Sequence, residues 1–198
     1  MTTTIYFVRH GQVDNPGKIA YGRMSGFHLS QAGKEQAAKT GKYFKDKNIS
    51  RIYTSPLERT FETANIISDY LKKTVRIVHK YELIEIDAHK WQSLPLSELF
   101  QNKYFESFVN DENSVEVGEN LSVLASRLEN FAMKVCGEHK GEEVICVSHE
   151  YPILAVRLKL EGKPLKLLKN SYAETASITT FVLNENCKIR EVTYTELQ

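Results

Sequence analysis

Two histidines stand where short apolar runs of the chain end. Arg9-His10-Gly11 follows residues 3–8 (TTIYFV), and Ser148-His149-Glu150 follows residues 144–147 (VICV). Runs of this kind indicate buried parallel strands, and ligands of open α/β sheets collect at the carboxyl ends of such strands. We therefore expect both histidines on one rim of one sheet, where an imidazole nitrogen flanked by arginines could accept a phosphoryl group.

A phosphate site needs cations and N–H donors, because a phosphate monoester carries about two negative charges near neutral pH. Arg9 and Arg59 have planar guanidinium groups that bind phosphate oxygens in pairs. Arg59 falls near the start of an expected helix, with Ser55 as its cap, Pro56 at its first position and Glu58 three residues after the cap. The free N–H groups of that helix start would face the same anion.

His10 is the better candidate nucleophile of the two histidines. A tight turn at Gly11 would let a backbone carbonyl accept a hydrogen bond from Nδ1–H, which leaves Nε2 unprotonated for attack. His149 would then donate to the phosphate. Attack gives a phosphohistidine that water later opens, so one hard displacement becomes two easier ones.

The leaving oxygen needs a proton donor, and residues 81–87 (YELIEID) offer three carboxyl groups. This stretch follows an expected strand at residues 75–78. A carboxyl group beside apolar neighbours can keep a raised pKa and act first as an acid and then as a base. Spacing alone leaves Glu82, Glu85 and Asp87 open.

Strands and helices alternate along the chain, which predicts an α/β fold with three α/β/α layers and a mostly parallel central sheet. The expected strands are residues 3–8, 51–54, 75–78, 144–147, 176–183 and 188–195. Helices are expected from Ser30 to about Lys47, after Ser55, at 96–109, at 119–135 and from near Pro152. The helix after Ser55 would turn five apolar residues inward: Leu57, Phe61, Ala64, Ile67 and Leu71. The polar loop 11–29 is too long for a mere connection and is expected to line a substrate pocket.

Size and composition are those of one compact domain. We expect a single domain over residues 1–198, with a small cap-like insert around 92–118, because 198 residues that are 41% hydrophobic can bury a substantial core. A net charge of +1 and scattered basic residues disfavour nucleic acid as a partner. No run approaches the roughly 20 apolar residues of a membrane helix, and residues 1–8 lack a basic leader. A soluble, unprocessed, cytoplasmic chain with a small substrate is expected.

Cysteine and histidine spacing gives no metal or disulfide motif. Cys136, Cys146 and Cys187 are odd in number and lack C-x-x-C spacing, which argues against a disulfide framework and a thiolate zinc site. We expect Cys136 and Cys146 in the core and Cys187 in a hairpin. No H-E-x-x-H or similar metal signature occurs, so neither a metal nor a cofactor is expected.

Four motifs follow one another in an order that resembles a known family. They are Arg9-His10-Gly11 after a strand, Leu29-Ser30-x-x-Gly33 at a helix start, Ser55-Pro56-Leu57-x-Arg59-Thr60-x-x-Thr63-Ala64, and Val147-Ser148-His149. Together they resemble the histidine phosphatase superfamily, also called the phosphoglycerate mutase-like family, over nearly the whole chain.

The resemblance assigns roles to the candidate residues. It implies that His10 is the phosphorylated nucleophile and that Arg9, Arg59 and His149 hold the phosphate. Residues 83–87, followed by Trp91, resemble the acid loop of the family, which selects Glu85 over Glu82 as the proton donor.

The chain departs from the family pattern at positions that bear on the substrate. The family commonly continues R-H-G with Glu, a small hydroxyl residue and, further on, Asn, whereas here residues 12–15 read QVDN and place Asn15 one position early. Residues 88–90 (AHK) lack the usual glycine, and Glu150 stands where glycine is frequent. The residues expected to bind the substrate beside the phosphate are Asn15, Tyr21, Gly22, Arg23 and Glu150.

The interval between Arg76 and Arg127 contains no arginine, which favours a phosphatase over a mutase. Mutases that resemble this family carry paired arginines there and must hold a bisphosphorylated acid. We expect a phosphatase that hydrolyses a small phosphorylated metabolite through a phosphohistidine. The alternatives are a cofactor-dependent phosphoglycerate mutase, a non-catalytic binding module on the same fold, and a metal hydrolase. The sequence leaves the oligomeric state open, with a homodimer as one option.

Overall fold

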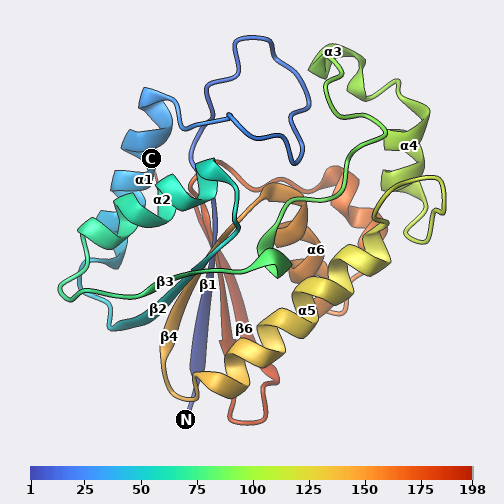
Figure 1. Ribbon diagram of the computed structural model, residues 1–198. Helices are drawn as coiled ribbons and strands as arrows, with labels where there is room; N and C mark the ends of the chain where they lie inside the picture. The colour runs from blue at the N-terminus through green and yellow to red at the C-terminus, as the bar shows by residue number, and fades with distance from the viewer. Residues whose placement is uncertain (198) are drawn as a thin grey trace.

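The computed structural model describes residues 1–197, which contain one mixed six-stranded sheet in the order β3-β2-β4-β1-β5-β6 (Figure 1). The strands are β1 (Thr3–Arg9), β2 (Ile49–Thr54), β3 (Ile77–His79), β4 (Glu143–Ser148), β5 (Ile178–Leu183) and β6 (Ile189–Thr195). Neighbours among β1 to β4 are parallel, whereas β5 runs antiparallel to both β1 and β6. The expectation of a mostly parallel central sheet is confirmed.

Helices cover both faces of the sheet (Figure 1). The helices α1 (Gln31–Phe44) and α2 (Glu58–Asp69) lie on one face, and α5 (Leu121–Glu138) and α6 (Glu150–Leu160) lie on the other. Side chains alternate between the two faces of a strand. Accordingly, Ile5 and Phe7 of β1 pack with α5 and α6, whereas Tyr6 and Val8 pack with α1 and α2. The predicted three layers are therefore present.

Residues 92–118 lie at the end of the molecule where the parallel strands finish (Figure 1). They include two helices, α3 (Leu96–Leu99) and α4 (Lys103–Asn110), instead of the single helix expected over 96–109. The chain breaks between them because Asn102 caps α4, with its side chain accepting from the N–H groups of Tyr104 and Phe105. A bridge between Ile19 and Pro95 ties this segment to the loop after β1.

Two expectations about α2 are wrong. The helix begins at Glu58 with Leu57 in the capping position, so the side chain of Ser55 does not cap it. Phe61 does not point inward: it is 37% exposed and its ring lies beside that of His79. The inward stripe of α2 instead contains Arg59, Thr60 and Thr63, all fully buried, because this end of the helix borders a polar site rather than the core.

A disulfide joins Cys136, near the end of α5, to Cys187, in the turn between β5 and β6, with 5.8 Å between their Cα atoms. The argument against a disulfide is therefore wrong, whereas Cys136 is buried and Cys187 lies in the hairpin, as expected. Fifty-one positions separate the pair in the chain, and only the return of the β5–β6 hairpin to the end of α5 brings them together. Cys146 is a buried free thiol in β4, as expected.

Short helices and loops complete the fold. Single 3-10 helices cover Tyr81–Leu83 and Leu165–Asn170. Within residues 1–197, every helix lacks the length or the apolar character that a membrane crossing requires.

Candidate active site

The two histidines lie side by side because they follow the neighbouring parallel strands β1 and β4. Arg9 is in register with Ser148, and the N–H of His10 donates to the carbonyl of Ser148 at 3.1 Å. The imidazole centroids of His10 and His149 are 5.2 Å apart, and both rings are buried. The expectation that both histidines share one rim of the sheet is confirmed.

His10 has the hydrogen bond that a nitrogen nucleophile needs. Its Nδ1 lies 2.8 Å from the carbonyl oxygen of Gly11. Because a carbonyl only accepts, Nδ1 carries the proton and Nε2 keeps its lone pair. Burial, followed by the charges of Arg59 and Arg9, holds the pKa of His10 well below its usual value. The ring is therefore neutral and nucleophilic at Nε2.

Two glycines allow the turn after His10 to form. A Cβ atom on Gly11 would collide with the backbone of Gly33, and a Cβ atom on Gly33 would collide with the backbone of Gln12. The loop after β1 therefore crosses the first turn of α1 in direct backbone contact. Ser30 caps that helix as expected, because its Oγ accepts from the N–H of Gly33 at 3.0 Å.

Arg59 projects from the first turn of α2 and is fully buried. Its Nη2 donates to the carbonyl of Gly22 at 2.7 Å, and its guanidinium carbon lies 4.8 Å from the centre of the Tyr21 ring. These contacts fix the guanidinium group while leaving other nitrogen atoms unused.

Arg9 is held from the opposite side. Its Nη2 pairs with Glu150 at 2.9 Å, and its Nη1 donates to the carbonyl of Ala173. Both terminal nitrogens of this guanidinium group thus have partners, and its orientation is set by protein groups.

The nitrogen atoms left unpaired gather around His10. Within residues 1–197, five buried side-chain nitrogens lack a hydrogen-bond partner, and four belong to three residues of this site: Arg9 Nε, Arg59 Nε, Arg59 Nη1 and His149 Nδ1. Buried donors are rarely left unsatisfied in folded proteins, and cationic donors bind anions most strongly. The cluster is therefore suited to binding an anion with several oxygen atoms.

His149 directly follows β4 and is the N-cap residue of α6. Its Nε2 lies 2.8 Å from the hydroxyl oxygen of Ser55. Burial and the charges of Arg59, His10 and Arg9 hold the pKa of His149 well below its usual value. Ser55 was predicted as a helix cap. The sequence carried no signal for its contact with His149, because Ser55 follows β2 and His149 follows β4.

Glu85 is the carboxyl group of residues 81–87 that lines the cavity beside His10. Burial raises the pKa of Glu85 to about 7, against the opposing effects of the Ile86 N–H and of Arg59. Glu82 lies in a 3-10 helix away from this lining. Burial alone would raise the pKa of Asp87, but hydrogen bonds from His89 lower it overall. Of the three carboxyl groups, Glu85 is the one in the cavity lining, and its raised pKa lets it carry a proton close to neutral pH.

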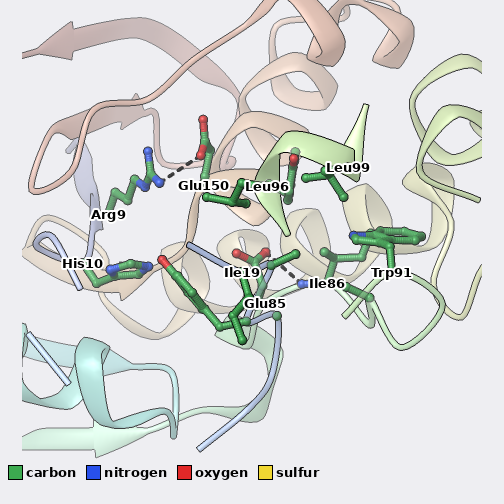
Figure 2. Close-up of a pocket in the computed structure, with 14 residues that line it drawn as sticks. Arg9, His10, Ile19, Glu85, Ile86, Trp91, Leu96, Leu99 and Glu150 are labelled. Carbon is green, nitrogen blue, oxygen red and sulfur yellow. Dashed lines mark hydrogen bonds and ion pairs between the residues drawn. The ribbon is translucent and has the colours of Figure 1, made fainter. Parts of the chain in front are cut away.

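The cavity has a volume of about 250 Å³ and two contrasting ends. Arg9 and His10 lie at one end, and Trp91 and Leu99 lie at the other (Figure 2). The loop 11–29 contributes to the lining, as predicted, through Ile19, Ala20, Tyr21 and Gly22.

The residues expected to bind substrate divide into two groups. Tyr21, Gly22 and Glu150 line the cavity, whereas Asn15 and Arg23 do not. The Asn15 amide instead bonds both the carbonyl and the N–H of Ile19, which shapes the loop.

Arg23 contacts the backbone of residues 83–87. Its Nε donates to the carbonyl of Glu85 at 2.7 Å, and its Nη2 pairs with Glu119 at 2.9 Å. Arg127 also pairs with Glu119 and donates to the carbonyls of Glu82 and Ile84. The two arginines therefore hold the backbone around Glu85, a supporting role that no local sequence signal indicated for Arg127.

Metal binding has no support in the geometry. Across the described residues 1–197, no group of three or more His, Cys, Asp or Glu side chains is arranged to hold a metal ion.

A three-layer α/β fold with two histidines and two arginines at one strand edge defines a protein suited to phosphoryl transfer. The chain belongs to the histidine phosphatase superfamily: residues 5–194 match the model of branch 1 of this family. Phosphoserine phosphatase 1 of Hydrogenobacter thermophilus is 30% identical over 190 residues, covering 91% of this chain and 87% of that protein.

Other similar proteins give the same picture. An uncharacterised protein of Mycobacterium tuberculosis is 32% identical over 174 residues, covering 82% of this chain and 81% of that protein. The crystal structure of a phosphoserine phosphatase from Entamoeba histolytica, in complex with 3-phosphoglyceric acid, superposes with a TM-score of 0.84. It is 22% identical and covers 99% of this chain and 98% of that chain, so this likeness bears on the fold.

Proposed function

We propose that this phosphatase hydrolyses a small phosphorylated metabolite in two steps, with His10 as the nucleophile. One observation carries the proposal: the unpaired buried nitrogens of Arg9, Arg59 and His149 surround a neutral His10 whose Nε2 is free. These donors match the oxygens of a phosphate group. The phosphatases among the similar proteins support the same class of substrate.

In the first step, Nε2 of His10 attacks phosphorus and the bond to the ester oxygen breaks. Glu85, which is partly protonated near neutral pH because its pKa is raised to about 7, gives its proton to the leaving oxygen. Arg9, Arg59 and His149 hold the phosphoryl oxygens as their charge shifts. The products of this step are a free alcohol, a phosphohistidine and an ionised Glu85.

In the second step, water opens the phosphohistidine. The carboxylate of Glu85 takes a proton from the attacking water, and the bond between phosphorus and Nε2 breaks. Inorganic phosphate leaves, and both His10 and Glu85 return to their starting forms. No metal is required in either step, since the arginines supply the positive charge.

Residues 92–118 form the cap of this site in our proposal, within one domain spanning the chain. The rings of Phe105 and Phe108 in α4 pack against Trp91, and Phe108 also packs against Tyr151. Trp91 and Tyr151 line the cavity. The cap therefore supports the wall opposite the phosphate site and limits entry to small substrates.

Labelling with a ³²P-labelled substrate tests the proposal. We expect the wild-type protein to acquire an acid-labile, base-stable label and His10→Ala to acquire none while losing hydrolysis. The matched control is His79→Ala, since His79 is exposed on the edge strand β3. Near-normal hydrolysis by His10→Ala would overturn the proposed mechanism. Loss of activity with a chelator, restored by a divalent cation, would favour a metal hydrolase.

A further inference from the structure

The charges along the cavity are unevenly distributed. Among the described residues that line it, Arg9 is the one cation, whereas Glu85 and Glu150 are both acidic. The lysines of the neighbouring sequence lie elsewhere: Lys90 and Lys103 both stack on the ring of Tyr104. Beyond the phosphate end, the described residues of the lining therefore offer no cation to a second anionic group.

Glu150 stands between the phosphate end and the rest of the cavity. It begins α6, its carboxylate pairs with Arg9 at 2.9 Å, and Figure 2 shows it above the path from His10 to the apolar end. Burial raises the pKa of Glu150 and the charge of Arg9 opposes that effect. The Glu150 carboxylate, paired with Arg9, thus lies beside the position where the substrate's alcohol must lie.

The rest of the wall is mostly apolar. Five large apolar side chains line it: Ile19, Ile86, Trp91, Leu96 and Leu99. Leu96 is 44% exposed at the cavity mouth, although it is a large apolar residue. Contact with an apolar group of a substrate would bury this surface, which is favourable in water.

We propose that the preferred substrate is a monoester of an apolar alcohol without a carboxylate, and that Glu150 disfavours carboxylated monoesters. This inference rests on the proposed phosphatase function. A substrate carboxylate would face Glu150 in a partly desolvated cavity whose one described cation, Arg9, is already paired with Glu150 and needed by the phosphate. Like charges repel strongly in such surroundings. The chain would thus differ in preference from a phosphatase acting on phosphoserine, whose alcohol carries a carboxylate.

Three matched alkyl phosphates test this preference: butyl phosphate, 4-(phosphonooxy)butanamide and 4-(phosphonooxy)butanoate. All three release a primary four-carbon alcohol, and the last two differ chiefly in charge. For the wild-type protein we expect the highest kcat/KM with butyl phosphate and at least about a tenfold advantage of the amide over the butanoate. This comparison needs no variant.

Glu150→Gln tests the residue itself. We expect it to bring the amide-to-butanoate ratio within about threefold, whatever its effect on each rate, because the substitution keeps the shape and removes the charge. Glu129→Gln removes one charge from α5, away from the cavity lining, and should keep the wild-type ratio. A ratio unchanged in Glu150→Gln overturns the role of Glu150.

Different results would overturn the substrate preference and the phosphatase function. If the wild-type protein hydrolyses the butanoate as well as the amide, or prefers it to butyl phosphate, the substrate preference is overturned while the phosphatase function stands. If it hydrolyses neither these esters nor phenyl phosphate, the proposed function itself is overturned.

Discussion

The hydroxyl oxygen of Ser55 lies 2.8 Å from Nε2 of His149, and both side chains are fully buried. The same oxygen accepts from the N–H of Leu57 at 3.4 Å. A neutral imidazole carries one proton, and the depressed pKa of His149 keeps it neutral. We expect Ser55 to donate to Nε2, so that the proton of His149 sits on Nδ1, the nitrogen that is unpaired and free to donate to phosphate.

Removing the Ser55 hydroxyl should let the His149 ring adopt either tautomer. We expect Ser55→Ala to lower kcat/KM by about tenfold, because one buried hydrogen bond to an active-site donor is lost. Nitrogen-15 NMR of His149 should change from one tautomer to a mixture. Ser50→Ala, which removes a hydrogen bond to the Glu143 carbonyl on β4, should alter neither. A single unchanged tautomer in Ser55→Ala would show that Ser55 does not position the ring.

Proton donation by Glu85 should appear as dependence on the leaving group. We expect Glu85→Gln to slow alkyl phosphates, whose alkoxides leave poorly, by ~10²–10⁴-fold and aryl phosphates much less. Glu82→Gln is the matched control and should show neither effect. If Glu85→Gln slows both substrate types equally and Glu82→Gln shows the dependence on the leaving group, Glu82 is the proton donor instead.

Burial of Glu85 should also make stability depend on pH. Its pKa is raised in the folded state, from 4.5 to about 7. The neutral form therefore contributes its full stabilisation below the unfolded-state pKa, and this stabilisation is lost as the pH rises through about 7. The wild-type protein should lose this stability as the pH rises, whereas Glu85→Gln should not. We therefore expect the free energy of unfolding of Glu85→Gln, relative to that of wild type, to increase by about 2 kcal/mol from pH 5 to pH 8. Urea denaturation at both pH values measures this. A pH-independent difference would contradict the raised pKa.

The disulfide should contribute to stability without touching catalysis. Closing a loop of about fifty residues stabilises a folded chain by ~4 kcal/mol in the chain-entropy description, so Cys136→Ser should lower Tm markedly. Its kcat/KM should be unchanged, because the bond lies at the far end of the sheet from the site (Figure 1). Dithiothreitol should reproduce the loss in wild type and have no effect on Cys136→Ser; equal Tm values would contradict a stabilising bond.

Local sequence signals predicted the sheet well because its strands are short apolar runs that end in distinctive residues. They failed where tertiary contacts decide. Cys136 and Cys187 are paired by the return of a hairpin, a long-range event that no spacing encodes. The cytoplasmic location expected partly from unpaired cysteines loses that support and stays a prediction.

The site shows the same division. His10 and its bond to the Gly11 carbonyl could be foreseen because the residues are adjacent in the chain. The contact between Ser55 and His149 could not be foreseen, because the proline and glutamate that follow Ser55 match the pattern of a helix cap. Arg23 looked like a substrate ligand from its place in the polar loop, yet Glu119, which it pairs with, is 96 residues away.

The position of β1 in the sheet bears on how the protein is made. This first strand lies between β4 and β5 and pairs with residues 143–148 and 178–183. Chains emerge from the ribosome amino terminus first, and pairings distant in sequence form slowly. A half-made chain therefore carries an apolar strand with neither neighbour yet synthesised, and such unpaired strands aggregate. Recovery of this protein from cells should therefore depend on how well chaperones protect the growing chain, besides the stability of the finished fold.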